Sequence, residues 1–551
     1  MTSNIFSILN TAKAGLLSQQ LGIEVVGHNI ANVQTEGFTR QEVNFSTARP
    51  RQTGLGLLGT GVRVDSITRD FDKFLFNQIL GEGSSTGNFG VRSDLFKTIE
   101  ILFNTTTGRN LSGDLDDLFL AFDDLAINPS GLAERTTVVA NAETLTSNFN
   151  LLGKNLFQER INADLSVNDT VSEINFLLDK IASLNSSIHS IETGLSPAND
   201  LRDKRDLAVL DLSKKLDIKI IDTKNNQVSI TLANGTPLVI GLNTFQLSTT
   251  PGPDNKGFKD ILISDGASGT TNITNQLEGG ELRGLIDVRD VELVDFIDQV
   301  DRLAASLITE FNAIHQLGVG LDGSTGINFF TPLTPTVNPS SLNTGTGVVT
   351  MTNASPSTVL VDKFQMQFTS ATDFDLINLT TGVNTGSFTF VPGAAFNVAG
   401  GLSVTITGVP VAGDIVDFSV SENAASTMSV ASAVLANTDK IAAGLSTTSD
   451  GDNALALSNL QDKLVFGGNT TFDGFFNSTV SLVGVRTRSA NDGLEQQDEL
   501  MLELENQRQS VSGVSIDEEM INLIKFQQAF EASARMITVV EEMFDVLQNS
   551  I

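Results

Sequence analysis

The sequence predicts a multidomain α+β protein: terminal helices paired as a coiled coil, a body of long bundled helices, and antiparallel β domains inserted into that body. Three observations support this fold class. Apolar residues recur every seven positions at both ends of the chain, which is the spacing of a coiled-coil contact face. A helical period dominates from residue 94 to about residue 215. Two later segments alternate between apolar and polar residues with period two, as strands do.

The C-terminal stretch, residues 512–551, carries the clearest heptad pattern. Ser515 and Glu518 have the spacing of a capping box, which satisfies free backbone N–H groups at the start of a helix. After Gly513, neither Gly nor Pro interrupts the run. We expect a long helix with one apolar assembly face, and such a face is also a helix-in-groove target that a chaperone can cover. The predicted contact residues are Leu523, Phe526, Phe530, Ile537, Val540, Phe544 and Leu547.

The N-terminal stretch repeats the pattern, so the two ends can pair with each other. Burying about eight such side chains gains roughly 1.5–3 kcal/mol each, whereas ordering the backbone costs about 1–2 kcal/mol per residue. An isolated pair of helices is therefore marginal, and we expect it to need partner chains. The alternative is two terminal helices packed on a globular core. The predicted N-terminal contact residues are Ile5, Leu9, Leu16, Ile23, Val26 and Ile30.

The composition excludes several functions. The net charge is −31, from 34 basic and 65 acidic residues, which argues against binding nucleic acid or an anionic membrane surface. Cysteine is absent, so there are no disulfides and no thiolate metal sites. No apolar run approaches the ~20 residues of a membrane helix. The first residues lack the pattern of a cleaved signal peptide, so we expect a cytoplasmic chain or one exported without a cleaved signal.

Two glycine motifs resemble catalytic or cofactor loops, and both are rejected on their context. Residues 54–59 match G-x-G-x-x-G, but the strand-like alternation of Val62, Val64 and Ile67 follows where a dinucleotide site needs a helix. Residues 83–87 match G-x-S-x-G, but the residues before them are helical in pattern, whereas a nucleophile elbow needs a strand there. We expect a flexible loop at the first motif and an interhelix loop at the second.

Helical patterns define the body. Apolar residues between Leu115 and Leu125 have i, i+3, i+4, i+7 spacing, and Pro129 marks a break. Residues 145–156 and 167–191 are expected to form long amphipathic helices that pack as antiparallel neighbours, and residues 285–315 form another. The acidic run at 114–117 lacks the spaced ligands of a calcium loop and is expected to be a solvated helix start.

Strand patterns define the two insertions. Alternation at Val228, Ile230 and Leu232, followed by the turn dipeptide Asn234-Gly235, predicts a β-hairpin. Residues 318–343 are rich in Gly, Pro, Ser and Thr and are expected to be a linker, and residues 346–422 are predicted to be strands and turns. The expected domains are 1–45 with 505–551 as the terminal coiled coil, 46–216 with 285–322 and 425–504 as the helical body, 217–284 as a small β insertion, and 323–424 as an outer β domain.

No pattern of catalytic, cofactor-binding or metal-ligating residues stands out. The three histidines, His28, His189 and His315, have no metal-ligand spacing. There is no Walker A lysine motif and no CxxC. Carboxylates are numerous, but nothing in the pattern singles out a pair, and on a strongly acidic surface they are normally solvated. We therefore predict that the protein is not an enzyme and has no cofactor.

The residues just after the N-terminal helix resemble a known signature. The segment NIAN-x-x-T-x-G-F is similar to the N-terminal signature of the bacterial flagellar axial proteins, which include rod, hook and hook-associated proteins. Members of this family usually carry Tyr at the last position, so the aromatic ring is retained here and the hydroxyl is lost. The signature residues in this chain are Asn29, Ile30, Ala31, Asn32, Thr35, Gly37 and Phe38.

The resemblance continues along the chain and points to the hook-associated members of the family. The stretches that carry it, in order, are LAINPSGLAER ending at Arg135, N-D-L-x-D-x-R-D at 199–206, N-x-x-H-x-x-G with G-x-x-F-F at 312–330, and residues 513–547. The β insertion resembles the family least.

This resemblance implies a structural protein of the flagellar axis that forms the junction between hook and filament and allows the filament to assemble. It implies self-association into a ring, with the hook protein on one side and the next hook-associated protein on the other. It also implies export through the flagellar type III channel without a cleaved signal, an extracellular location, and an export chaperone that binds the C-terminal helix. Alternatives are another axial protein (flagellin-like or hook), or a secreted adhesin or enzyme with oligomerising ends.

Overall fold

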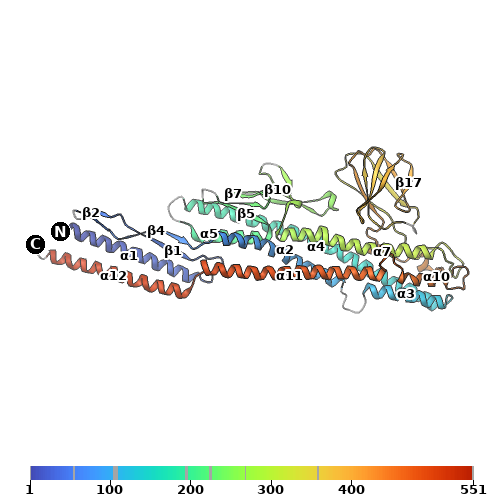
Figure 1. The fold of residues 1–551 in the computed structure, drawn as a ribbon, viewed down its shortest axis with the longest axis horizontal. Helices are drawn as coiled ribbons and strands as arrows, with labels where there is room; N and C mark the ends of the chain where they lie inside the picture. The colour runs from blue at the N-terminus through green and yellow to red at the C-terminus, as the bar shows by residue number, and fades with distance from the viewer. Residues whose placement is uncertain are drawn as a thin grey trace.

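The computed structural model describes residues 2–548, apart from 54–55, 104–109, 193–196, 223–225, 267–268 and 356–358. The molecule is a long rod with both chain ends at one end of it, and a β domain rises from its side near the other end (Figure 1). Helices dominate and the sheets are antiparallel, so the predicted α+β class is confirmed. None of the described helices is both long and apolar enough to cross a membrane.

The two terminal helices form an antiparallel hairpin, here called the terminal hairpin. It consists of α1 (Thr2–Ala31) and α12 (Ile516–Gln548). Phe6, near the start of α1, stacks edge-on against Phe544, near the end of α12, at 5.1 Å between ring centroids. At the other end of the hairpin, Asn29 of α1 hydrogen-bonds Glu519 of α12. Ser515 caps α12 as predicted, because its Oγ accepts the Glu518 N–H.

A two-stranded ribbon runs along the terminal hairpin. Strand β1 (Gln41–Thr47) pairs with β4 (Val62–Arg69), and between them β2 (Arg51–Thr53) pairs with β3 (Gly56–Leu58). Residues 54–55 of the G-x-G-x-x-G stretch lie outside the described part; its residues 56–58 form β3, and the strand β4 follows. The absence of a following helix confirms that the motif is not a dinucleotide loop.

Helix α2 (Lys73–Phe103) runs without interruption through residues 83–87, so the predicted interhelix loop is wrong. The reason is close packing against the end of α5 (Asn199–Lys215). A Cβ on Gly87 would lie 1.9 Å from the carbonyl oxygen of Lys214. These glycines allow α2 and α5 to approach each other closely, and α2 continues through them.

The body is a bundle of long helices. Helix α4 (Leu132–Ile191) is one continuous helix of 60 residues, where two separate helices were expected. Helix α6 (Gly280–Asp287) passes through one π turn, Val288–Glu292, into α7 (Leu293–His315), so this helix begins earlier than predicted. The bundle is completed by α3 (Leu111–Ile127), the short helices α8 (Ala424–Thr427), α9 (Ser432–Ala436) and α10 (Asp452–Ser458), and α11 (Phe472–Ser512).

The small β insertion packs on α4 and α5. The predicted hairpin is confirmed: β6 (Val228–Leu232) pairs with β7 (Pro237–Ile240), and Gly235 adopts φ 92° in the turn. These strands lie in a sheet of order β5-β6-β7-β8, beside a second of order β11-β10-β9. The other strands are β5 (Ile218–Asp222), β8 (Asn243–Thr244), β9 (Leu247–Pro251), β10 (Lys259–Ser264) and β11 (Thr270–Asn272).

The outer β domain contains two sheets, of order β12-β19-β14-β15-β16 and β13-β18-β17. Phenylalanines fill its core; Phe374, for example, contacts Phe388, Phe390 and Phe396. Strand β12 lies in the segment predicted as a linker. The strands are β12 (Thr336–Pro339), β13 (Val348–Asn353), β14 (Phe364–Phe368), β15 (Asp373–Asn378), β16 (Val383–Thr389), β17 (Ala395–Val398), β18 (Leu402–Thr407) and β19 (Ile415–Ser419).

The predicted start of this domain at residue 323 is too early. Phe329 and Phe330 are fully buried in the helical body, where both rings contact Phe311 and Phe329 also contacts Phe122. Asn312 holds them in place, because its Oδ1 accepts both of their backbone N–H groups at 2.9 Å. The outer β domain therefore begins after these residues.

Candidate assembly interface

The predicted contact residues of α12 lie on the less exposed side of that helix. Val540 is 2 % exposed, and Leu523, Phe526, Phe530, Ile537, Phe544 and Leu547 are half-buried. Two contacts show what this side meets: Phe526 lies against Gly22 of α1, and Phe544 against Phe6. We call this side of α12 the inner face.

The predicted contact residues of α1 are buried at Ile5 and Val26 and half-buried at Leu9, Leu16, Ile23 and Ile30. Sequence reasoning missed two glycines that let the helices approach. A Cβ on Gly15 would meet Ser533 Oγ at 3.1 Å, and one on Gly22 would meet the Phe526 ring at 3.1 Å. Their heptad spacing was the signal that could have revealed them.

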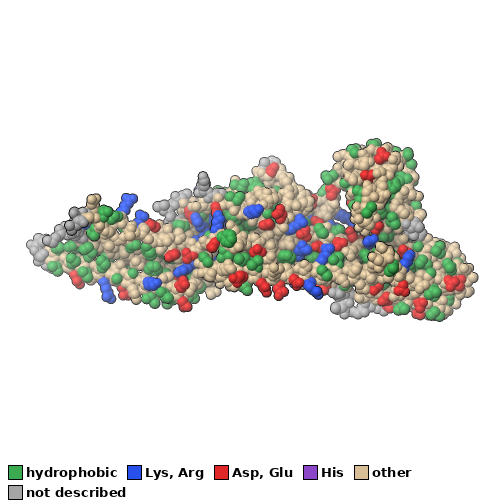
Figure 2. All heavy atoms as spheres, in the orientation of Figure 1, with side chains coloured by type: hydrophobic (Ala, Val, Ile, Leu, Met, Phe, Trp, Pro, Cys, Tyr) green, Lys and Arg blue, Asp and Glu red, His purple; other side chains and the backbone are tan. Residues whose placement is uncertain are grey.

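A second apolar surface runs along α12 and faces solvent; we call it the outer stripe. Its members are between 45 % and 70 % exposed: Met520, Ile521, Ile524, Met536, Val539, Met543 and Val546. Phe6 and Leu17 of α1 are also more than half exposed. Hydrophobic side chains are visible over this end of the rod (Figure 2). The members fall into two exposed apolar groups, at 520–524 and 536–546, and exposed apolar patches mark interaction sites.

The signature residues lie where the terminal hairpin meets the body. Asn29 is 1 % exposed and bridges three segments. Its Nδ2 donates to the Gln41 carbonyl at 2.9 Å and to Glu519 Oε2 at 3.2 Å, and its Oδ1 accepts the Gln41 N–H. Asn32 accepts the Thr35 hydroxyl, which closes the turn after α1. Ile30 is half-buried and Ala31 is exposed.

Gly37 and Phe38 complete this turn. Gly37 has φ 74°, a left-handed conformation that glycine adopts without strain. A Cβ there would also lie 3.3 Å from Leu207. The Phe38 ring stacks edge-on against His28 at 5.4 Å. Since the contact is between rings, this structure explains how Phe can stand where the family usually has Tyr.

The motif at 199–206 docks beside the signature. Asp203 accepts the Thr39 N–H at 3.0 Å, and Arg69, at the end of β4, reaches both Asp203 and Asp206. Asn199 donates to Gln41 Oε1 and to the Ile67 carbonyl. Two motifs that are about 160 positions apart in the chain therefore form one contact.

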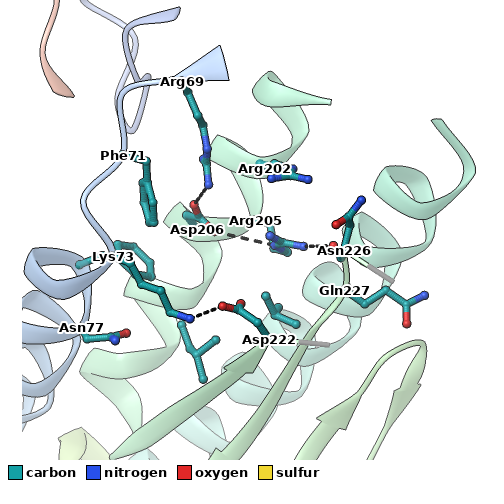
Figure 3. Close-up of a pocket in the computed structure, with 13 residues that line it drawn as sticks. Arg69, Phe71, Lys73, Asn77, Arg202, Arg205, Asp206, Asp222, Asn226 and Gln227 are labelled. Atoms are coloured by element: carbon teal, nitrogen blue, oxygen red, sulfur yellow. Dashed lines mark hydrogen bonds and ion pairs between the residues drawn. The ribbon is translucent and has the colours of Figure 1, made fainter. Parts of the chain in front are cut away.

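A cavity of about 340 Å³ lies next to this contact (Figure 3). Its basic residues already have carboxylate partners: Arg69 meets Asp206, Lys73 meets Asp222 and Arg202 meets Glu192. Arg205 lies 3.8 Å from Asp206. The charges are balanced within the protein, so the cluster is structural. Among the described residues, no group of three or more His, Cys, Asp or Glu could hold a metal ion.

The motif that begins at Asn312 contains His315, which links three segments of the body. His315 is fully buried; its Nδ1 lies 2.7 Å from the Ile327 carbonyl, and its Nε2 accepts the Ala442 N–H at 2.9 Å. Only the neutral ring with a proton on Nδ1 can make both bonds. Burial lowers the pKa of His315 to about 4, from an ordinary value of 6.5.

His315 should make the body less stable in acid. The unfolded chain binds the proton below pH 6.5 and the folded chain only near pH 4, so stability is lost as pH falls through this window. Over the whole window the loss is about 3 kcal/mol. Burial raises the pKa of Asp301 to about 7, so this group changes the free energy of unfolding with pH in the opposite direction. Urea unfolding of the parent and of His315→Gln at pH 4 to 7 measures the effect. Both proteins contain Asp301, so its contribution cancels in the difference between their free energies of unfolding. A parent-minus-variant stability difference that stays constant with pH would contradict the prediction.

An elongated helical rod, with both chain ends in one hairpin and its motif residues used for packing, is typical of a structural protein. The similarity of this chain to known proteins identifies its family. A family model described as the helical domain of flagellar hook-associated protein FlgK matches residues 96–330. Another, described as the C-terminal region of the flagellar basal body rod FlgEFG proteins, matches residues 505–550.

Full-length relatives agree with these matches. Flagellar hook-associated protein 1 of Salmonella typhimurium is 30 % identical over 565 residues, covering 98 % of this chain and 99 % of the relative. The Bacillus subtilis protein of that name is 25 % identical over 583 residues, covering 100 % and 99 %. The chain belongs to the flagellar hook-associated protein 1 family, which confirms the resemblance seen in its motifs.

The fold also matches a solved structure. The flagellar hook junction protein FlgK from Burkholderia pseudomallei superimposes with a TM-score of 0.69 at 21 % identity, covering 79 % of this chain and 100 % of that one.

Proposed function

We propose that this chain is an axial structural protein of the bacterial flagellum, which forms the junction between hook and filament and allows the filament to assemble on the hook. The observation that carries the proposal is the terminal hairpin with its exposed outer stripe, in a chain that matches hook-associated protein 1 over its whole length. The structural class of its relatives also supports a protein without enzymatic activity.

The two apolar faces of α12 support the proposal that copies of this chain associate into a ring. The inner face is turned to α1 within one chain, whereas the outer stripe has no cover in a single chain. Burying an apolar side chain of this size gains roughly 1.5–3 kcal/mol. We infer that outer stripes of neighbouring copies pack together around the axis to form an inner tube, with the body and the β domains outside it.

The remaining partners are the hook protein on one side of the ring and the next hook-associated protein on the other. Before assembly, the chain leaves the cell by the flagellar type III route without a cleaved signal. On that route α12 is separated from α1 and exposes both apolar faces, so an export chaperone that holds it in a groove would keep it soluble.

Locating the tagged protein on isolated hook–basal bodies tests the proposal. We expect the tag at the distal end of the hook, and a deletion strain that builds hooks without filaments. A deletion strain that lacks the hook itself would instead favour another axial protein. A closed small oligomer in sedimentation, with no flagellar defect on deletion, would favour an adhesin or enzyme with oligomerising ends.

Removing the outer β domain should leave export and junction formation largely intact, because the domain rises from the side of the rod. Thr336 pairs with Ser419, so the cut ends of a 336–419 deletion lie about 5 Å apart and a short Gly-Ser link can close them. Filament counts in a strain secreting normal amounts of this variant measure the outcome, and absent filaments would contradict the prediction.

A wider deletion, residues 324–422, serves as the matched comparison. It also removes Phe329 and Phe330 and leaves Asn312 without its partners. We expect this variant to be unstable, so the two deletions separate loss of the domain from damage to the body.

A further inference from the structure

We infer that Arg40, Asn29 and Glu519 are positioning residues, which lock the angle between the terminal hairpin and the body. The lock is a property of the single chain. Its importance for assembly rests on the proposed function, and the two claims are tested separately below.

Three segments of the chain meet where the terminal hairpin joins the body, and Arg40 touches all of them. It lies on the first, just before β1. Its backbone N–H donates to the Ser512 carbonyl on the second, at the end of α11, at 2.9 Å. Its carbonyl accepts the Asp70 N–H on the third, between β4 and α2, at 2.9 Å. One residue therefore ties together the three segments that a hinge motion would have to separate.

The Arg40 side chain adds a charged contact to α12. Its Nε donates to Glu519 Oε1 at 2.8 Å, and its Nη1 lies 3.4 Å from Glu518 Oε2 and 3.9 Å from Asp70 Oδ2. Both segments that flank the elbow between α11 and α12 are thus held by the same residue, through Ser512 on one side and Glu519 on the other.

Glu519 makes the lock strong because its carboxylate is buried. The residue is 1 % exposed, and its two oxygens are taken by Arg40 Nε and Asn29 Nδ2. Asn29 belongs to the hairpin and moves with Glu519, so rotating the hairpin against the body would pull this carboxylate from Arg40. Removing one partner of a buried charge pair is strongly destabilising. Asn29 extends the network to the end of α1 and to Gln41 at the start of β1.

Neighbouring contacts hold the network against the body. Thr39, next to Arg40, is fixed to Asp203 of α5, and Asp203 is bound by Arg69 at 2.5 Å. Both partners of this second ion pair are largely buried. The hairpin therefore continues into the body through hydrogen-bonded groups rather than through a free linker.

Distance measurements by electron spin resonance test the lock directly. The native chain has no cysteine, so Lys97→Cys on α2 and Glu531→Cys on α12, both exposed positions, give two unique label sites. We expect one narrow distance peak in the labelled parent and loss of that peak, as a broad distribution, in Glu519→Gln. Asp517→Asn is the matched control, since Asp517 lies in the same first turn of α12 and is exposed; it should keep the narrow peak.

Three results would overturn the lock: a broad distribution in the parent, a narrow one in Glu519→Gln, or equal broadening in both variants. Thermal unfolding of the body should be the same in all variants, which separates a loss of positioning from a loss of folding. Global unfolding of Glu519→Gln would assign the residue to stability and overturn the positioning role.

The assembly claim has its own readout. A strain secreting normal amounts of Glu519→Gln should lose filaments, whereas Asp517→Asn should keep them. Normal filaments in a variant with a broad distance distribution would show that assembly does not need the fixed angle. If the parent itself is absent from the hook–filament junction, the proposed function fails while the distance result still stands.

Discussion

Replacing Phe530 with Asp should abolish both chaperone binding and junction assembly. Phe530 is half-buried on the inner face of α12, the side that carries Phe526 and Phe544 against α1. An aspartate there places a carboxylate at an apolar contact without a partner, which is costly. The same change interrupts the apolar face that a chaperone groove would cover. Pull-down with the chaperone and filament counts measure the two effects.

Two further variants place the effect on a face of α12. Glu531→Ala changes an exposed residue and should do little to either measurement. Val539→Asp puts the same charge on the outer stripe, where Val539 is 53 % exposed, so the hairpin should still form while ring assembly fails. If Phe530→Asp still binds the chaperone and builds filaments, the inner face has neither role.

Local patterns were sufficient where a few neighbouring residues decide the structure. The Ser515 cap of α12 and the turn at Asn234-Gly235 between β6 and β7 were predicted correctly. Each depends only on groups within a few positions of the chain. The heptad count placed the inner face of α12 for the same reason. It followed one face only, so the outer stripe, whose residues recur on the other side of the same helix, was not identified.

Contacts between distant segments explain the errors. Gly87 lies within a helix because it meets the Lys214 carbonyl, which is 127 positions away and invisible to a local pattern. The Gly, Pro, Ser and Thr content of residues 318–343 suggested a linker. Pro339 within it ends an edge strand that pairs with β19, a position where a sheet tolerates proline. Phe329 and Phe330 were assigned to the wrong domain because only the fold shows which core they enter.

Only some residues of the joint between hairpin and body could be predicted from the sequence. The resemblance singled out Asn29 and Gly37 through their motif, but it gave them no physical role. Glu519 belongs to an acidic helix start, where a negative charge is ordinarily a solvated partner of the helix dipole. Its burial against Arg40 depends on two segments separated by 479 positions, so sequence reasoning had no means of choosing it over Glu518.

Replacing Arg135 with Met should destabilise the body by about 3 kcal/mol. Arg135 closes the LAINPSGLAER motif and is fully buried. Its Nε and one terminal nitrogen donate to the Pro129 carbonyl, and the other terminal nitrogen donates to the carbonyls of Thr438 and Ile441. It therefore holds the turn between α3 and α4 against the segment after α9.

Two opposing effects decide the size of this loss. Burial lowers the pKa of the Arg135 guanidinium, which shows that the charge itself is costly, and methionine removes that cost. It also leaves the Pro129 carbonyl without its Arg135 donors, at about 1–3 kcal/mol. The Thr438 and Ile441 carbonyls each lose one hydrogen bond, at about 0.5–1.5 kcal/mol each, but keep a backbone donor, the N–H groups of Ile441 and Ala443. The second effect is larger, because the guanidinium is bound by backbone groups that remain in place after the change.

Urea unfolding of purified Arg135→Met measures the result, with Lys154→Met as the matched control. Lys154 is an exposed residue of the same helix, so its loss should change stability by no more than about 0.5 kcal/mol. Arg135→Lys should recover part of the loss, because a single ammonium can reach some of the three carbonyls but cannot span both sides of the contact. Equal stability of Arg135→Met and Lys154→Met would show that this tip of the rod is held by its apolar core alone.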